Sequence, residues 1–443
     1  MIDRGNKNYL LGVLLLVMVI SVFDRFVFAL ALEPIKQDLN LSDSQLGLMT
    51  GIAFAAFYAI AGVPIARWAD RGNRVTISAI AVGLVGIMVS LCGLATNFFQ
   101  LLLARAGVAV GEAGAVPPAQ SLLSDYFNRV ERPRAMGIYF MGYPLSMIVG
   151  YLLGGWLLDV LGWRMTFIVL AIPGVLVAIL VKLTLKEPRL VQQTIEAIEL
   201  PSLVVTFRHL WRQQTFRYMF LAFCVGNFFF MGVGQWLATF FIRSHGLSTA
   251  AVGVWLALSF GVCGLLGNYL GGYCASRYAA GKEQLQMRAI ALLYLFNVVV
   301  SVVIYLATNT YVALLFAAAS SFLLSLSNGP IFASIQSLVP ERMRSVAIAL
   351  LFMFSNLIGF GFGPLLLGIA SDLLSPSFGQ ESLRYALVLF CPGGLLVAYL
   401  YWKVGNTVEE DIDSAMEVCA EIMKSESTLH TRNASAFSSE NHV

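Results

Sequence analysis

The sequence predicts an all-α integral membrane protein with twelve transmembrane helices in two pseudo-symmetric six-helix bundles. The 443 residues are 58% hydrophobic and only 12% charged, with a mean hydropathy of +0.78, so they lack the polar residues that cover a water-soluble globule of this size. The apolar residues fall into twelve runs of membrane-spanning length. These runs divide into two sets of six, and the two sets resemble each other.

Each apolar run is long enough to cross a bilayer, which takes about 20 mostly apolar residues of helix. The first run goes well beyond the apolar core of a signal peptide and has no small-residue cleavage site at its end, so we expect a retained helix and no targeting sequence. In chain order, the predicted helices are 9–32, 45–66, 75–96, 98–122, 135–158, 164–185, 217–242, 250–275, 288–307, 310–338, 344–370 and 383–404.

The distribution of basic residues predicts the orientation, because cytoplasmic loops carry an excess of lysine and arginine. With the N-terminus inside, 22 of the 28 basic residues fall on the inner side, two lie within helices, and four lie outside: Lys36, Arg164, Arg243 and Arg384. We therefore expect both termini to be cytoplasmic, in a plasma (inner) membrane. The net charge of +3 follows from this orientation and does not indicate a nucleic-acid partner.

Hydropathy breaks between Lys186 and Arg217, which divides the chain into two halves. Apolar residues at helical spacing within this break predict an amphipathic helix on the cytoplasmic surface, most simply a tether. The polar C-terminal stretch that opens with EEDID (409–413) predicts disorder. The predicted domains are a first six-helix bundle at 1–189, a cytoplasmic linker at 190–215, a second bundle at 216–405 and a disordered cytoplasmic tail at 406–443.

The two halves repeat one another at corresponding helices. The fifth helix contains GYPLSMIVGYLLGG (142–155) and the eleventh contains GFGFGPLLLGIASD (359–372). The loop after the second helix, ARWADRGNRVTI (66–77), corresponds to GGYCASRYAAGKEQLQMR (271–288) after the eighth. Gly/Pro-rich helices at matching positions are typical of duplicated transporters, whose substrate path lies between the halves.

The sequence contains no pattern that indicates a cofactor or an enzyme. Its six cysteines are scattered, with no CxxC or Cys/His spacing of a metal site. It has no GxxxxGK[ST] loop for ATP, and no GxSxG or HExxH motif. We therefore expect no metal, no cofactor and no enzymatic activity.

Two pairs of charged residues lie deep inside predicted helices, where ionisable groups are costly and usually functional. Asp24 and Arg25 lie in the first helix, and Arg105 and Glu112 lie two turns apart in the fourth. Asp24 and Arg25 diverge by about 100°, so we expect one to face the fourth helix and the other a cavity or another helix. Desolvation disfavours a charged carboxylate and a nearby arginine favours it, so a change of partner can couple protonation to conformation. The alternative is a static network that pins helices.

A compact charge cluster of Asp70, Arg71 and Arg74 ends the second helix. An aspartate here can accept hydrogen bonds from the start of a neighbouring helix and hold the inner face shut, so we interpret these residues as a conformational latch. Arg277 occupies the corresponding loop of the second half and is included in this prediction.

Five further polar residues lie in helices that often line a central path: Tyr139, Tyr143, Asn227, Gln235 and Asn328. We interpret them, with Arg25, as candidate substrate contacts. Each serves equally well as a hydrogen-bonding residue between helices.

ADRGNR (69–74), Arg105 and the glycine-rich fifth helix resemble conserved motifs of the major facilitator superfamily, over residues 9–405. The resemblance implies that fold. Two positions depart from the family pattern: Ala66 replaces a glycine of the loop motif, and Ser276 stands where the second copy is expected to have aspartate. We therefore expect the second latch to be weaker than the first.

Within the superfamily, FDRF (23–26), GVAVGEAG (107–114), PPAQSLLSDYF (117–127) and GWRMTF (162–167) look like the spinster branch, whose animal members move lysophospholipids and sphingolipids. The resemblance implies proton sensing and gating for Asp24 and Glu112, with Arg105 as their partner and Arg25 as a contact for an anionic headgroup. The anion:cation symporter branch, which carries organic acids, also has Asp-Arg in the first helix and Gly-Glu in the fourth.

These observations predict a proton-coupled secondary transporter that works by alternating access and moves an amphipathic lipid-like or small organic anionic substrate. The alternatives are an organic-acid/proton symporter of the anion:cation type and a non-transporting membrane sensor built on a transporter fold. The expected partners are membrane lipids, the substrate and protons, and we expect a monomer.

Overall fold

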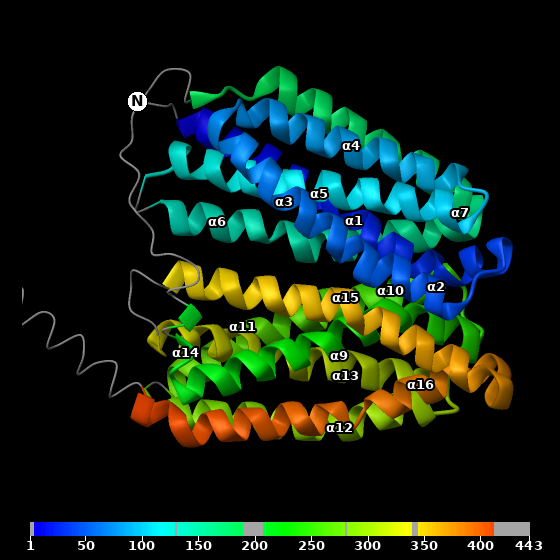
Figure 1. Ribbon diagram of the computed structural model, residues 1–443, viewed down its shortest axis with the longest axis vertical. Helices are drawn as coiled ribbons and strands as arrows, with labels where there is room; N and C mark the ends of the chain where they lie inside the picture. Colours follow the sequence, from blue (N-terminus) through cyan, green and yellow to red (C-terminus); the bar gives the residue numbers. More distant parts are fainter. Residues whose placement is uncertain are drawn as a thin grey trace, which may run out of the picture.

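The computed structural model describes residues 4–128, 131–188, 207–208, 210–279, 281–338 and 344–411, and these residues form a bundle of long helices (Figure 1). Ten stretches are long and apolar enough to cross a membrane. Two of them, Arg134–Thr184 with 51 residues and Leu350–Asp411 with 62, each contain two crossings, because a single helix of either length would extend roughly 75 Å or more. The predicted twelve-helix architecture is therefore confirmed.

The first half occupies the upper part of Figure 1 and contains six crossings. The second crossing is built from three consecutive helical pieces, and the fifth and sixth are joined at Gly162, whose φ of 71° lets the chain turn back. The elements are α1 (Arg4–Leu39), α2 (Asp43–Leu48), η1 (Met49–Ala53), α3 (Phe54–Arg71), α4 (Arg74–Leu94), α5 (Phe98–Tyr126), α6 (Arg132–Phe140) and α7 (Gly142–Thr184).

The second half repeats this order in the lower part of the view. Its second crossing again contains a π-helical turn, η3, at the position that corresponds to η1. The elements are α9 (Gln214–His245), α10 (Thr249–Leu256), η3 (Ala257–Cys263), α11 (Gly264–Tyr278), α12 (Glu283–Leu306), α13 (Thr310–Leu326), α14 (Asn328–Leu338), α15 (Arg344–Phe378), η5 (Gly379–Glu381), α16 (Ser382–Phe390) and a last helix at 393–411.

Short polar caps set where many of these helices begin. Asn97 accepts a hydrogen bond from the Gln100 N–H, and Asn309 does the same for the start of α13. Ser42 and Ser248 cap α2 and α10 in the same way. Each side-chain oxygen satisfies a backbone donor that the helix itself cannot pair.

The predicted linker and tail lie largely outside the described residues, at 189–206, 209 and 412–443. At the described end of the linker, Leu210 is fully buried, and Phe207 stacks on Trp211 with ring centroids 5.1 Å apart. Phe207 also stacks on Phe354 of α15. The last helix continues to residue 411, six residues beyond the predicted end of the second bundle at 405.

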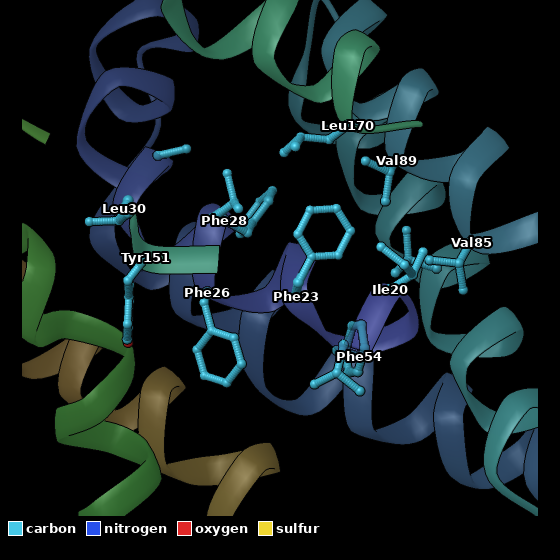
Figure 2. Packing of buried hydrophobic residues seen from close by; sticks show 14 of the residues in the cluster. Ile20, Phe23, Phe26, Phe28, Leu30, Phe54, Val85, Val89, Tyr151 and Leu170 are labelled. Carbon is cyan, nitrogen blue, oxygen red and sulfur yellow. The ribbon is translucent and has the colours of Figure 1, made fainter. Parts of the chain in front are cut away.

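The bundle has two ends, which we name the terminal end, where α1 begins and the last helix ends, and the far end, where α1 ends at Leu39 (Figure 1). One large apolar core includes residues of both halves, from Leu14 of α1 to Trp236 of α9. Phe23, Phe26 and Phe28 leave α1 in different directions to fill it (Figure 2). A second core, around Phe216 and Met287, draws its described residues from the second half alone. Within the described part of the chain, the two halves therefore share the first of these cores and not the second.

Candidate functional site

The four charged residues predicted within the membrane form two ion pairs between α1 and α5. Arg105 donates from Nη1 to Asp24 Oδ2 at 2.7 Å. Arg25 donates from Nε to Glu112 Oε2 at 2.7 Å, and its Nη2 contacts the same oxygen. Asp24 and Arg25 therefore have different partners, as their divergence of about 100° requires, but both partners lie on α5. Both reach α5, because the long arginine side chains span the 100° divergence and the two turns between Arg105 and Glu112.

Three of the four residues are buried and Arg25 is 19% exposed, yet the pairs are not fully satisfied. Asp24 is 0% exposed, Glu112 2% and Arg105 4%. Three of their polar atoms have no hydrogen-bond partner within the described chain: Asp24 Oδ1, Glu112 Oε1 and Arg105 Nε. Buried polar groups are normally paired, so these three atoms are exceptions that packing alone does not explain.

Aromatic rings surround both guanidinium groups. Arg25 lies over Phe54 at 4.8 Å and over Phe360 at 5.1 Å, measured from the guanidinium carbon to the ring centroid. Arg105 lies over Phe28 at 4.3 Å and over the same Phe54 at 4.9 Å. Phe360 belongs to α15, so Arg25 is in contact with both halves of the protein. The negative faces of these rings favour the cations and exclude water.

One cavity adjoins these pairs, and a second cavity adjoins the first. A cavity of about 70 Å³ lies between the halves and is lined by Arg25, Arg105, aromatic rings and Gln235. A larger one, of about 230 Å³, lies within the second half, and no charged side chain is among its lining residues. The two cavities share three lining residues: Phe230, Gly234 and Phe260.

One stripe of hydrogen-bonded side chains lies on the wall of the larger cavity, which also carries other polar residues such as Asn227 and Asn328. Ser320 of α13 donates to Asn297 Oδ1 of α12 at 2.7 Å, and Asn297 in turn approaches Ser301 at 3.4 Å. Phe229 and Phe390 provide part of the apolar lining. The cavity therefore offers neutral hydrogen-bonding groups beside a large apolar surface.

The predicted substrate contacts fall into three groups. Arg25, Tyr143 and Gln235 line the smaller cavity. Asn227 and Asn328 line the larger one, and each also bonds a neighbouring helix: Asn227 Nδ2 donates to the backbone of α15 at 2.7 Å, and Asn328 Nδ2 donates to α11 at 3.0 Å. Tyr139 is fully buried and lines neither cavity, and its hydroxyl has no partner within the described chain.

The predicted latch is only partly described. Arg74 is fully buried, and its guanidinium bonds Glu187 at 2.5 Å, Asp125 at 2.6 Å and Ser121 at 2.9 Å. These contacts tie α4 to α5 and to the segment that follows α7, all within the first half. The side chain of Asp70 lies outside the described part of the chain, and Arg71 and Arg277 are exposed at the ends of α3 and α11.

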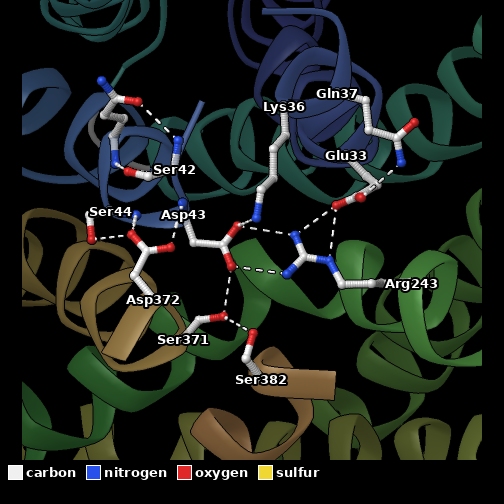
Figure 3. A network of polar contacts seen from close by, with 11 residues as sticks. Glu33, Lys36, Gln37, Ser42, Asp43, Ser44, Arg243, Ser371, Asp372 and Ser382 are labelled. Atoms are coloured by element: carbon white, nitrogen blue, oxygen red, sulfur yellow. Dashed lines mark hydrogen bonds and ion pairs between the residues drawn. The ribbon is translucent and has the colours of Figure 1, made fainter. Parts of the chain in front are cut away.

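A charge network at the far end escaped the sequence analysis (Figure 3). Arg243 at the end of α9 bonds Glu33 of α1 at 2.7 Å and Asp43 of α2 at 2.9 Å, so it joins the two halves. Lys36 bonds Asp43 at 2.7 Å. Asp372 of α15 accepts from the backbone at the start of α2. In the sequence, Arg243 and Lys36 are two of the four basic residues predicted on the outer side. Their departure from the orientation bias was itself a signal for this network.

The described residues contain no group of three or more His, Cys, Asp or Glu side chains placed to hold a metal ion. The chemistry available at the central site is therefore that of carboxylates, guanidinium groups, neutral amides and hydroxyls.

Comparisons with known proteins agree with this architecture. A family model described as "Major Facilitator Superfamily" matches residues 14–364. The solved structure of a bacterial homologue of the human lysosomal transporter spinster, inward-facing and unoccupied, superimposes with a TM-score of 0.83 at 27% identity, over 92% of this chain and 99% of that one. An "MFS-type efflux pump" of Mycolicibacterium smegmatis is 33% identical over 90% of this chain and 93% of its own. A probable L-galactonate transporter of Escherichia coli is 24% identical over 84% of this chain and 83% of its own.

Proposed function

The chain belongs to the Major Facilitator Superfamily of transporters, and from this premise we propose that it is a proton-coupled secondary active transporter that works by alternating access. One observation carries the proposal: two ion pairs, Asp24–Arg105 and Arg25–Glu112, join α1 to α5 beside a cavity between the halves. Ionisable groups inside a membrane protein usually mark a substrate or proton path.

The coupling follows from the competition for Arg25. While Glu112 is charged, it occupies the guanidinium of Arg25. Protonation of Glu112, whose Oε1 has no described partner, releases Arg25 for an anionic group of the substrate in the smaller cavity. A proton and an anion therefore bind cooperatively, which is the requirement for symport of the two or for their linked release.

The cavities support an amphipathic substrate with an acidic group. The anionic group meets Arg25 in the smaller cavity, and the apolar part enters the larger cavity past Phe230 and Phe260. The larger cavity has no charged group in its described lining, so it suits an uncharged chain or ring system. This is the substrate class of a lysolipid or another lipid-like acid.

We propose that the terminal end faces the cytoplasm of a cell whose plasma membrane holds the protein, with both termini inside, on the ground of the basic-residue distribution. The far end, where the halves are joined, then faces outward. We also propose that the two bundles, at 1–189 and 216–405, move against each other. We propose that the protein works as a monomer.

An organic-acid/proton symporter is the second candidate, and the stripe of Asn297, Ser301 and Ser320 favours it. Neutral amides and hydroxyls of this kind recognise hydroxyl groups, as a sugar acid would present them. The relatives of this chain include the probable L-galactonate transporter and a hexuronate transporter of Bacillus subtilis.

Uptake into proteoliposomes under an imposed pH gradient tests the proposal and separates its alternatives. Labelled lysophosphatidic acid and labelled galactonate are the two probes. We expect accumulation of one probe that depends on the gradient. Accumulation of galactonate alone selects the second candidate. Binding of a probe, measured as thermal stabilisation, without any transport selects a non-transporting sensor.

A further inference from the structure

The far end is held by two contacts of the same design. Asp372, near the end of α15, accepts from the N–H groups of Asp43 and Ser44 at 3.0 and 2.8 Å. Asp159 of α7 accepts from the N–H groups of Thr249 and Ala250 at 3.1 and 3.2 Å. In each case a carboxylate from one half caps the first residues of a helix in the other half. We name them the α2 clasp and the α10 clasp.

The duplication is visible in the sequence. LSDSQLG (41–47) corresponds to LSTAAVG (247–253), and a G-x-x-x-D pattern ends both partners, with Gly368 before Asp372 and Gly155 before Asp159. A Cβ on Gly155 would lie 2.6 Å from the carbonyl oxygen of Thr249, and one on Gly368 would collide with the carbonyl of Asp43. The backbones of the two halves therefore touch at both clasps.

The two clasps differ in charge and burial. Position 43 of the α2 clasp is an aspartate, and the matching position of the α10 clasp is Thr249. Asp43 is bonded by Lys36, by Ser371 at 2.6 Å and by Arg243, whose side chain is only 6% exposed (Figure 3). Asp159 is exposed, and it accepts hydrogen bonds from backbone N–H groups and a hydroxyl group at the start of α10.

We propose that Arg243 is the gating residue of the far end and that the α2 clasp, rather than the α10 clasp, determines when this end opens. Opening at the α2 clasp pulls Arg243 of the second half away from Glu33 and Asp43 of the first, so buried charges must be rehydrated separately. Opening at the α10 clasp releases a carboxylate that is already hydrated. The proposal rests on the alternating access proposed above, but it concerns the conformational equilibrium, which can be measured without substrate or transport.

Distance measurement between spin labels tests the proposal on the full-length chain. One label replaces Thr96, in the loop before α5, and the other replaces Thr308, in the loop before α13, after substitution of the six native cysteines. Both loops are exposed at the far end and take no part in either clasp. The readout is the ratio of molecules with long and short label separations in detergent at neutral pH.

Removal of one partner of a buried ion pair costs far more than removal of one partner of an exposed contact. Arg243→Gln is therefore expected to raise the ratio of open to closed molecules by at least about tenfold. The matched control Asp159→Asn is expected to change it by less than about fivefold. Equal shifts, or a larger shift for Asp159→Asn, would overturn the proposal.

Two further variants keep the test decisive if Arg243→Gln does not fold. Glu33→Gln leaves Arg243 paired with Asp43 and is expected to open the far end by more than Asp159→Asn does. Arg243→Lys retains the charge and is expected to restore most of the closed state. An unchanged ratio in Glu33→Gln would contradict the gating role. If the variants shift the ratio as expected but the wild-type protein transports neither probe, the proposed function is contradicted and the gating role of Arg243 stands.

Discussion

Arg25 of α1 and Glu112 of α5 are joined by a 2.7 Å hydrogen bond from Nε to Oε2, and the same guanidinium lies 5.1 Å from the ring of Phe360 in the opposite half. One side chain thus contacts a buried carboxylate, a cavity and both halves of the protein.

Substitution Glu112→Gln is expected to remove the pH dependence of anion binding. A neutral amide leaves Arg25 free at any pH, as protonation of Glu112 does in the wild type, so wild-type affinity rises as the pH falls while the variant stays at the high-affinity level. Thermal-shift titrations with lysophosphatidic acid at pH 6 and pH 8 measure this. The exposed Glu381→Gln is the control and is expected to keep the wild-type response. Persistence of that response in Glu112→Gln would refute the role of this residue.

The Asp24–Arg105 pair is expected to show strong coupling in a double-mutant cycle. Asp24→Asn leaves Arg105 buried without a counter-charge and should lower the free energy of unfolding by about 3–5 kcal/mol. The double variant with Arg105→Gln removes both charges and should recover at least about 1 kcal/mol of the summed loss. Unfolding in mixed micelles gives these values.

The exposed pair Asp38–Arg164, at 2.6 Å, is the matched control for this cycle, and its coupling should be below about 1 kcal/mol. Equal coupling for the two pairs would show that burial does not govern the central site.

Substitution Gly234→Leu is expected to block transport without loss of stability. Gly234 lines both cavities, and a Cβ there meets nothing within 4 Å, so a leucine fills the passage between them. Uptake should fall by at least about tenfold, since overfilling a space costs roughly 1–3 kcal/mol. Gly12→Leu, also with open space around its Cβ and away from both cavities, is the control. Normal uptake by Gly234→Leu would remove this passage from the substrate path.

Substitution Arg74→Gln is expected to lower the free energy of unfolding by about 3–5 kcal/mol, because Glu187 and Asp125 lose the cation that they share. Its neighbour Arg71, exposed at the end of α3, should tolerate Arg71→Gln within about 0.5 kcal/mol. Unfolding monitored by tryptophan fluorescence distinguishes the two. Similar stability of both variants would mean that Arg74 is not a structural tie.

The sequence was sufficient for the parts of the fold that local composition determines. Apolar length and the Gly/Pro repeats predicted twelve helices in two halves, and the cost of charge in lipid identified Asp24, Arg25, Arg105 and Glu112. The partners within this set could not be derived from spacing, because the crossing of α1 and α5 decides which arginine meets which carboxylate.

The Arg243 network was missed for a different reason. Its members come from α1, α2, α9 and α15, and each one alone reads as an ordinary charge at a helix end. The repeated LSxxxxG and GxxxD patterns were the available signal, since helix ends that are duplicated in both halves indicate a shared contact.

Proton counting tests the central claim most directly. Purified protein in weakly buffered detergent is mixed with the probe that stabilises it, lysophosphatidic acid or galactonate, and a pH-sensitive dye reports the protons taken up. The account predicts uptake of about one proton per bound anion near neutral pH in the wild type and none in Glu112→Gln. Equal uptake by the two proteins, or anion binding without any uptake in the wild type, would contradict it.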